Sequence, residues 1–191
     1  MFKIALTGGI GTGKTYLSKH FIQMGIPVFY ADEEAKKLYE NQPFQQKLDE
    51  LFHHEGLIVN HRVNIPLLSS LVFGDEQKLQ ALNALVHPAV MELFEQWAGQ
   101  QHSYAVMMES AIIYEGGLAH YFDKVIVADA PLELRIERIM TRNPNLTRED
   151  ILQRMARQMP QQEKCCMADL VVCTGETYEL SCKKLSADMH F

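Results

Sequence analysis

Residues 8–15 read Gly8-Gly9-Ile10-Gly11-Thr12-Gly13-Lys14-Thr15, and this stretch fits the pattern G-x-x-x-x-G-K-[ST]. Glycines in that pattern let backbone N–H groups close around phosphate oxygens, the lysine adds a positive charge, and the final hydroxyl can bind Mg²⁺. An apolar run at 3–7 precedes the stretch and a helical pattern follows it, as the pattern requires. The sequence therefore predicts a nucleotide-binding loop with Thr15 as a metal ligand. We expect the nucleotide contacts to come from Gly8, Gly11, Thr12, Gly13, Lys14, Thr15 and Tyr16.

Four further apolar runs are typical of buried strands, and they cover residues 27–30, 104–108, 124–128 and 169–173. Helical patterns separate these runs, so strands and helices alternate along the chain. Such alternation predicts an α/β fold in three layers, with a five-stranded parallel sheet and helices on both of its faces.

The connection between the second and third strands, residues 31–103, is far longer than the dozen or so residues that a crossover needs. Its apolar residues keep helical spacing and predict helices that bury one face. The stripes comprise Phe44, Leu48, Leu51 and Phe52 after Pro43, then Leu79, Leu82, Leu85 and Val86, then Val90, Leu93, Phe94 and Trp97. We therefore predict one domain with a core at 1–30 and 104–191. Residues 31–103 form a helical insertion beside the sheet, where a substrate could bind.

The composition limits the possible partners. The chain of 191 residues has 18 Lys and Arg against 24 Asp and Glu, a net charge of −6. This balance argues against nucleic-acid binding, because neutralising phosphates needs a basic excess. No apolar run is long enough for a membrane span, and the N-terminal run is too short for a secretory signal. We expect a cytoplasmic protein, a monomer or small homo-oligomer, with no membrane or nucleic-acid partner.

The cysteines are Cys165, Cys166, Cys173 and Cys182. Their spacing fits no paired zinc pattern, and adjacent cysteines rarely form a disulfide with each other. The spacing favours reduced thiols in the cytosol, and a redox role for Cys165-Cys166 is the alternative.

Three carboxylates follow predicted strands, at the edge where open α/β sheets bind ligands. They are Asp32, Glu109 and Asp129. Phosphoryl transfer to a hydroxyl needs a carboxylate that accepts or orients the acceptor proton, and Asp32 is best placed because the insertion begins beside it. The alternative for Asp32 is the N-cap of a helix over 33–39, and one residue can do both. For Asp129, which precedes Pro131, we expect a helix cap.

The arginines are concentrated in one window. Six of the seven lie between residues 135 and 157, and the other is Arg62. Arg135, Arg138 and Arg142 are spaced to share one face of a helix, which the Asn143-Pro144-Asn145 stretch ends.

A second helix is predicted to begin at Thr147, because Asp150 three residues later completes a variant of the capping box. Two arginine-bearing helices joined by a short tip predict a lid at 138–158 that closes over phosphates. We expect Arg138 and Arg142 to act on the transferring group, whereas Arg135 and Arg148 pair with nearby acidic residues.

Together these features resemble the dephospho-coenzyme A kinase family along nearly the whole chain. The loop alone is unspecific, but its combination with the other shared elements is specific. Those elements are Ala31-Asp32, the run from Leu82 to His87-Pro88, Arg138-x-x-x-Arg142, Arg154-Met155-x-x-Gln158 and Ala168-Asp169.

The chain also departs from the family pattern. Tyr30 stands where the family usually has Asp, and Thr174 stands where Asn is common. The family's Pro-Leu-Leu-Phe-Glu run appears as a run from Ala111 to Glu115, with Glu109 in place of an upstream Asp.

The resemblance implies that ATP, with Mg²⁺, phosphorylates the ribose 3′-hydroxyl of dephospho-coenzyme A to give coenzyme A and ADP. It implies that Asp32 is the base and that His87 and Glu115 shape the acceptor pocket, with Lys14, Arg138 and Arg142 as the other catalytic side chains. The alternative for His87 is a core histidine. Two functions remain as alternatives: another P-loop kinase acting on a nucleotide or nucleoside, and a nucleotide-binding protein without enzymatic activity.

Overall fold

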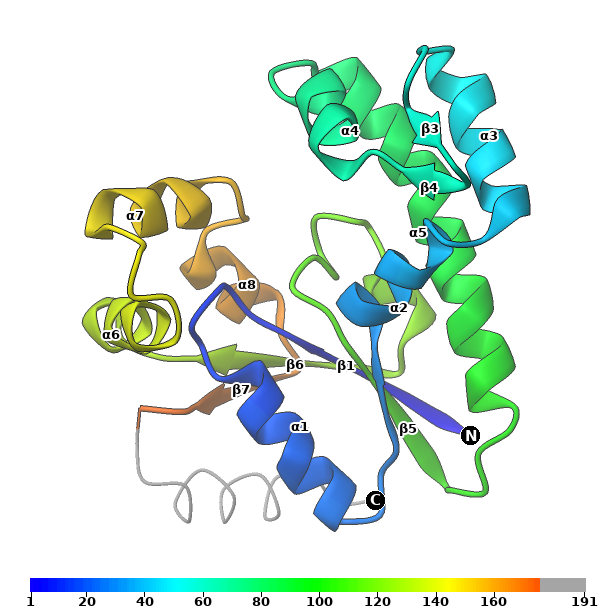
Figure 1. Ribbon diagram of the computed structural model, residues 1–191. Coiled ribbons are helices and arrows are strands. Elements are labelled where there is room, and N and C mark those ends of the chain that lie inside the picture. Colours follow the sequence, from blue (N-terminus) through cyan, green and yellow to red (C-terminus); the bar gives the residue numbers. More distant parts are fainter. Residues whose placement is uncertain (176–191) are drawn as a thin grey trace. The chain divides into compact units, whose positions relative to one another are not determined.

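The computed structural model describes residues 1–175 (Figure 1). Its main sheet is five-stranded and parallel, in the order β2-β5-β1-β6-β7. The strands are β1 (Phe2–Thr7), β2 (Val28–Tyr30), β5 (Ala105–Glu109), β6 (Lys124–Asp129) and β7 (Leu170–Cys173). All five predicted strands are therefore confirmed to within one residue or so at each end. β1 lies between β5 and β6, so the segment that follows it emerges at the middle of the sheet.

The chain divides into two compact units. The sheet unit comprises residues 1–29 and the described residues from 101 on, and the helical unit comprises residues 30–100. No helix within residues 1–175 is both long and apolar enough to cross a membrane.

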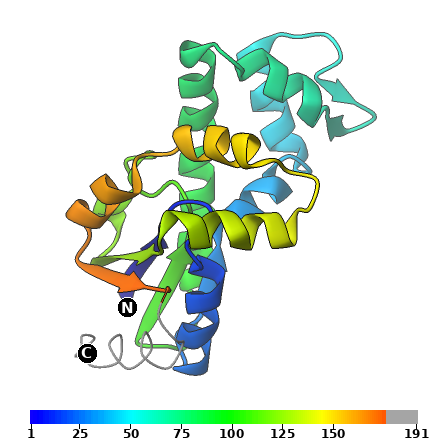
Figure 2. The ribbon, with the colours of Figure 1, turned by 90° about the vertical axis from the view of Figure 1, so that its left-hand side faces the viewer.

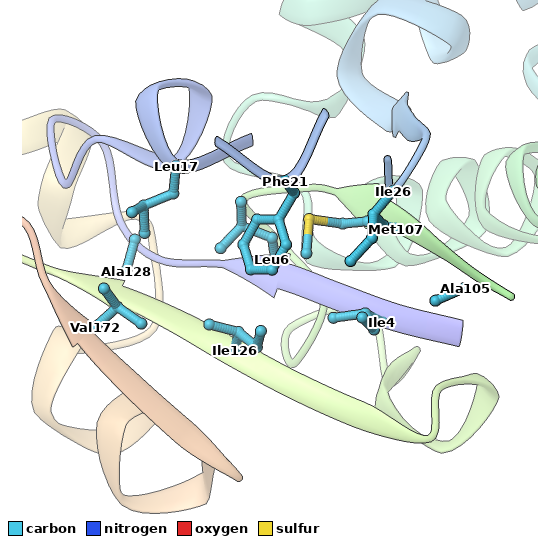
Figure 3. Close-up of a cluster of buried hydrophobic side chains, with 10 residues drawn as sticks. All are labelled: Ile4, Leu6, Leu17, Phe21, Ile26, Ala105, Met107, Ile126, Ala128 and Val172. Atoms are coloured by element: carbon cyan, nitrogen blue, oxygen red, sulfur yellow. The ribbon is translucent and has the colours of Figure 1, made fainter. Parts of the chain in front are cut away.

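The core of the sheet unit explains why the apolar runs form a sheet. Ile4 and Leu6 alternate with residues of the opposite face along β1, and both are fully buried. Leu17 and Phe21 of α1 (Lys14–Gln23) lie one helical turn apart and pack onto them (Figure 3). The remaining members of this cluster are Ile26, Ala105, Met107, Ile126, Ala128 and Val172.

Helices cover both faces of the sheet. Figures 1 and 3 show α1 on one face and α8 (Gln161–Met167) on the other, where it packs near β6. A short 3₁₀ helix, η1 (Ala119–Tyr121), leads into β6. The predicted three-layer α/β architecture is confirmed.

The predicted lid region contains α6 (Leu132–Arg142) and α7 (Arg148–Ala156), which Figure 2 shows one above the other, joined by a short loop. Ile136, Ile139 and Ile151 form the buried core between them. The Thr147 hydroxyl accepts the N–H of Asp150, and the Asp150 carboxylate accepts the N–H of Thr147. The capping box predicted from these two residues is confirmed.

The helical unit contains α2 (Ala31–Leu38), α3 (Gln42–Phe52), α4 (Ile65–Val72) and α5 (Glu76–Ala98). The α3 helix has Pro43 in its first turn, as predicted, and Asn41 is its N-cap. Two predicted apolar stripes, one before and one after Pro88, lie on the single helix α5. Pro88 removes a helical hydrogen bond, but the buried side chains on both sides of it, Leu82 and Phe94, hold the helix together.

A two-stranded hairpin in the helical unit was absent from the sequence prediction. It pairs β3 (Ile58–Val59) with β4 (Arg62–Val63), antiparallel. Asn60 and His61 between them both have positive φ, at 51° and 58°, as a type I′ hairpin turn requires. Strands of two residues are too short to show alternation, so no pattern marked them.

Candidate functional site

The phosphate-binding loop is shaped by glycines that no other residue can replace without strain. Gly8 follows β1 with φ 142°, and an added Cβ would lie 2.5 Å from the carbonyl oxygen of Ala128. Gly11 has φ 82°, and its Cβ would lie 2.7 Å from the Arg135 carbonyl oxygen. Gly13, with φ 89°, is the N-cap of α1. The backbone of the loop thus lies too close to β6 at Gly8 and to α6 at Gly11 for a side chain at either position.

We expect Gly8→Ala to lower the free energy of unfolding by about 3 kcal/mol, because a left-handed φ and a backbone clash act together. Gly25→Ala is the matched control, since Gly25 has φ 81° with open space around its Cβ position and carries the strain alone, about 1 kcal/mol. Urea denaturation of both variants measures the difference. Equal losses would show that the contact with Ala128 carries no cost.

The second half of the loop offers donors to an anion. Within residues 1–175, no acceptor faces the N–H of Gly11 or Gly13. These groups lie at the N-terminus of α1, where the helix dipole favours negative charge. The Lys14 ammonium is folded back on the loop and donates to the Gly8 carbonyl oxygen at 2.8 Å. Tyr16, directly after the motif, is half exposed on α1.

Two oxygen-bearing side chains, those of Thr15 and Glu109, lie beside the second half of the loop. The Thr15 hydroxyl donates to Glu109 Oε1 at 3.2 Å. Glu109 is the last residue of β5 and is opposite Leu6 of β1 in register, so the parallel sheet brings it to the loop. A hydroxyl and a carboxylate are the hard oxygen ligands that Mg²⁺ prefers. No cluster of three His, Cys, Asp or Glu side chains suited to a metal occurs among the described residues.

Arg135 contradicts its predicted pairing with acidic neighbours. Its side chain is buried, and Nε donates to the Ile10 carbonyl oxygen of the loop at 3.0 Å. Burial lowers the pKa of Arg135 from its usual value, and the nearby Asp129 opposes that shift. The helix spacing that placed Arg135 on the face of Arg138 was right, but that face is turned to the loop and not to solvent.

Arg138 is also bonded to the loop region. Its Nη1 donates to Thr174 Oγ1 at 2.9 Å, and its Nη2 donates to the Thr174 carbonyl oxygen at 2.7 Å. The Thr174 hydroxyl in turn donates to the Thr12 carbonyl oxygen at 2.5 Å. Thr174, which stands where the family commonly has Asn, therefore links the end of β7 to the loop.

Arg142 and Arg148 differ in their surroundings. Arg148 forms two hydrogen bonds to the Glu133 carboxylate, at 2.7 and 2.6 Å, so its predicted ion pair is confirmed. Hydrogen bonding to Arg148 lowers the pKa of Glu133. Arg142, the last residue of α6, is exposed, and within residues 1–175 no carboxylate or carbonyl oxygen accepts from its guanidinium.

Glu115 lies in the sheet unit and makes a structural ion pair. Its Oε1 is 2.7 Å from the ammonium of Lys164, whose side chain is fully buried. The same carboxylate oxygen accepts the N–H of Met159 at 3.0 Å, and Lys164 also donates to the Ala111 carbonyl oxygen at 2.6 Å. Glu115 therefore fixes the segment between α7 and α8.

Asp32 and His87 both belong to the helical unit, on α2 and α5, which pack against each other. Asp32 is the second residue of α2 and is exposed, while Tyr30 occupies the N-cap position. The capping alternative for Asp32 is therefore wrong, because the helix begins two residues earlier than predicted. His87 is half-buried, and its Nε2 is a buried atom with no partner in the described chain. Burial lowers the pKa of His87 and favours the neutral ring.

The predicted cap at Asp129 is also wrong. Pro131 is the N-cap residue of α6, and no side chain bonds to that helix end. Asp129 instead ends β6, and its carbonyl oxygen accepts the N–H of Thr174 at 2.7 Å. An extra residue, Ala130, separates strand from helix and leaves Asp129 out of reach of the cap.

Two glutamines at the loop escaped the sequence analysis as functional candidates. Gln158 Oε1 accepts the N–H of Ile10 at 2.8 Å, and Gln161 Oε1 accepts the N–H of Gly9 at 2.9 Å. About 150 residues separate each pair, so no local spacing could reveal them. The family motif ending in Gln158 was the one available signal.

The described cysteines, Cys165, Cys166 and Cys173, form no disulfide. Burial raises the pKa of the Cys165 thiol. Cys182 lies outside the described residues.

Comparisons with a family model and with curated relatives point to the same protein family. A family model described as dephospho-CoA kinase matches residues 2–179. A dephospho-CoA kinase of Bacteroides fragilis is 38% identical over 172 residues, which cover 89% of this chain and 83% of that protein. One from Hydrogenovibrio crunogenus is 33% identical over 189 residues, covering 97% and 95%.

Solved structures agree with this family at the level of the fold. A Thermus thermophilus protein has a TM-score of 0.85 at 32% identity, covering 97% of this chain and 95% of that one. The dephospho-CoA kinase from Campylobacter jejuni has a TM-score of 0.68 at 24% identity, covering 97% and 96%. Shikimate kinase from Bacteroides thetaiotaomicron, at 15% identity, TM-score 0.55 and coverage of 97% and 96%, shares the fold alone. Since the family model spans nearly the whole chain and relatives exceed 30% identity, the chain belongs to the dephospho-CoA kinase family and is a kinase with the P-loop fold.

Proposed function

We propose that this protein transfers the γ-phosphoryl group of ATP to the ribose 3′-hydroxyl of dephospho-coenzyme A, giving coenzyme A and ADP. This is the last step of coenzyme A synthesis. The observation that carries the proposal is the combination of family membership with a phosphate loop whose Gly11 and Gly13 N–H groups lack acceptors in the described chain. The net charge of −6 supports an enzyme without a nucleic-acid partner, and the free thiols of Cys165, Cys166 and Cys173 support a location in the cytoplasm. We propose a monomer or small homo-oligomer.

The nucleotide's phosphates are proposed to bind the loop. Donors come from the backbone of Gly11 and Gly13 and from the Lys14 ammonium, which would exchange the Gly8 carbonyl for a phosphate oxygen. Gly8 and Thr12 shape the loop, since the Thr12 hydroxyl donates to the Gly9 carbonyl oxygen at 2.8 Å. Tyr16, on the exposed side of α1, is proposed to border the bound nucleotide.

Acceptor binding is assigned to the helical unit. Asp32 is proposed to orient and deprotonate the ribose hydroxyl, since its carboxylate is exposed at the N-terminus of α2. His87 Nε2, a buried atom without a partner in residues 1–175, is proposed to bond a polar group of the acceptor. Arg142 is proposed to stabilise charge on the transferring group, and Arg138 to add positive charge beside the loop. Glu115 is proposed to shape the acceptor pocket through the segment that it fixes.

The Thr15 hydroxyl and the Glu109 carboxylate are proposed to hold Mg²⁺, directly or through water. When bound, the ion neutralises charge on the β- and γ-phosphates. The two side chains already lie within hydrogen-bond distance of each other, so a single ion can contact both without rearrangement of the sheet.

We expect Thr15→Val and Glu109→Gln each to raise the Mg²⁺ concentration for half-maximal activity by at least about tenfold, because each removes an oxygen ligand or its charge. Thr141→Val is the control, since Thr141 is an exposed threonine on α6 whose hydroxyl bonds its own helix. Titration of activity with Mg²⁺ at fixed ATP measures the effect. A Mg²⁺ dependence unchanged from that of Thr141→Val would remove these two residues from the metal site.

The proposed reaction is tested by coupled ADP release from ATP with three acceptors: dephospho-coenzyme A, a nucleoside panel and shikimate. The expected result is ADP release with dephospho-coenzyme A alone, and a product carrying one added phosphate on the ribose 3′-oxygen. Release with a nucleoside or with shikimate alone would reassign the substrate. Nucleotide binding without ADP release for any acceptor would favour a binding protein.

A further inference from the structure

The first half of the phosphate loop is bonded to side chains of the lid region and of α8. Gly9 donates its N–H to Gln161 Oε1, and Ile10 donates its N–H to Gln158 Oε1, at 2.9 and 2.8 Å. The Ile10 carbonyl oxygen accepts from Arg135 Nε. Two of the loop's amide donors are therefore already used by the protein, which leaves phosphate binding to the second half of the loop.

Gly9 gives independent support for this arrangement. The motif requires glycine at positions 8 and 13 but accepts any residue at position 9. A Cβ on Gly9 would lie 2.4 Å from Arg135 Nη2 and 3.2 Å from Gln161 Oε1. The close approach of these two side chains thus explains a glycine that phosphate binding alone does not require.

The two glutamines are themselves held in place. The Gln161 amide nitrogen donates to the Ala128 carbonyl oxygen at 3.0 Å, so this side chain connects the loop to β6. Met159, next to Gln158, donates its N–H to Glu115, whose carboxylate pairs with the buried Lys164. These contacts connect Gln161 to β6 and the segment between α7 and α8 to Glu115.

The side chain of Ile10 strengthens the connection from the other direction. It packs against the apolar core shared by α6 and α7, formed by Ile136, Ile139 and Ile151. The loop at Ile10 is thus bound to the lid region through its N–H, its carbonyl oxygen and its side chain.

We propose that Gln158 and Gln161 are positioning residues: their amide oxygens hold the N–H groups of Ile10 and Gly9 so that the remaining loop amides converge on the ATP phosphates. A neutral amide suits this role, because a carboxylate would place negative charge beside the bound phosphates. This inference rests on the proposed use of the loop for ATP, and it adds two residues that contact no substrate.

The test compares Gln158→Met and Gln161→Met, which keep side-chain length but lose the acceptor, with Gln162→Met. Gln162 is the matched control because it is an exposed glutamine on the same helix as Gln161. We expect each positioning variant to weaken binding of a fluorescent ADP analogue and to raise the KM for ATP by about five- to tenfold, as expected for a lost, partly buried hydrogen bond. The KM for dephospho-coenzyme A should change by less than about twofold, and Gln162→Met should match the wild type.

Amide hydrogen exchange in the unsubstituted protein gives a readout that is independent of how the variants fold. The N–H groups of Gly9 and Ile10 should exchange at least about tenfold more slowly than those of Gly11 and Gly13 in the absence of nucleotide. Rapid exchange at Gly9 and Ile10, or nucleotide binding by both variants equal to that of Gln162→Met, would overturn the proposal.

The proposed function can fail separately from this inference. A wild-type protein that binds the ADP analogue but leaves dephospho-coenzyme A unphosphorylated would refute the proposed substrate. The comparison of nucleotide binding between Gln158→Met and Gln162→Met would still decide the role of the two glutamines.

Discussion

Asp32→Asn is expected to lower kcat by about 10²–10⁴-fold, because the amide keeps the shape of the side chain but cannot accept the proton of the attacking hydroxyl. The KM for ATP should change little, because the proposed contacts to the phosphates of the nucleotide come from the loop backbone and the Lys14 ammonium. Steady-state kinetics with ATP and dephospho-coenzyme A measure both parameters.

The stability of this variant is informative as well. Tyr30 occupies the N-cap position of α2, so Asp32 makes no capping bond that the substitution would break. The free energy of unfolding should therefore stay within about 0.5 kcal/mol of the wild type. Glu33→Gln is the matched control, because Glu33 is the next residue of the same helical turn and is also exposed. Turnover by Asp32→Asn that is as fast as that of Glu33→Gln would exclude a base at this position.

The sheet and the loop were predictable because their signals are local. Each strand of the sheet is a short apolar run, and the loop motif fixes residue types within eight positions, so neighbouring residues carry the information. The same holds for the capping box of Thr147 and Asp150, which are three residues apart. Pattern and structure agree for these elements, whereas the caps predicted at Asp32 and Asp129 failed because α2 and α6 have Tyr30 and Pro131 at their N-caps.

Other predictions failed where distant contacts decide the role of a side chain. Helix spacing placed Arg135 correctly on α6, but only tertiary packing brings it to Ile10, 125 residues away in the sequence. Gln161 and Lys164 have no pattern of their own, because their partners lie in the loop and in the segment after β5. Family resemblance could point to Gln158 as a shared residue, but its contact with Ile10 needed coordinates.

The arginines of the lid region now divide by what they touch. Arg135 and Arg138 are bonded to backbone carbonyl groups of the loop and of Thr174, and Arg148 is paired with Glu133. Among these residues, only Arg142 has no accepting group in the described chain. An exposed guanidinium at the end of a helix has the freedom to meet a charge that forms only during the reaction.

Arg142→Ala is therefore expected to lower kcat by about 10²–10³-fold, the usual cost of losing one donor to a developing negative charge. The KM for ATP should rise by less than about threefold, because the loop backbone and Lys14 hold the nucleotide before the reaction begins. Arg148→Ala is the control: it removes an exposed arginine from the neighbouring helix, where the ion pair with Glu133 occupies the guanidinium. Its kcat should remain within about twofold of the wild type.

Whether Arg142→Ala changes kcat or the KM for ATP decides the role of Arg142. A fall in kcat at unchanged KM means that the guanidinium binds the transition state more tightly than the ground state, whereas a raised KM at unchanged kcat means uniform binding. The second pattern would make Arg142 an anchor for ATP and leave the transferring group without a donor from this helix. Because Arg138 is already bonded to Thr174 and Gly11, it would act only through its charge beside the loop, and direct contacts to the transferring group would have to come from Lys14 and the metal ion.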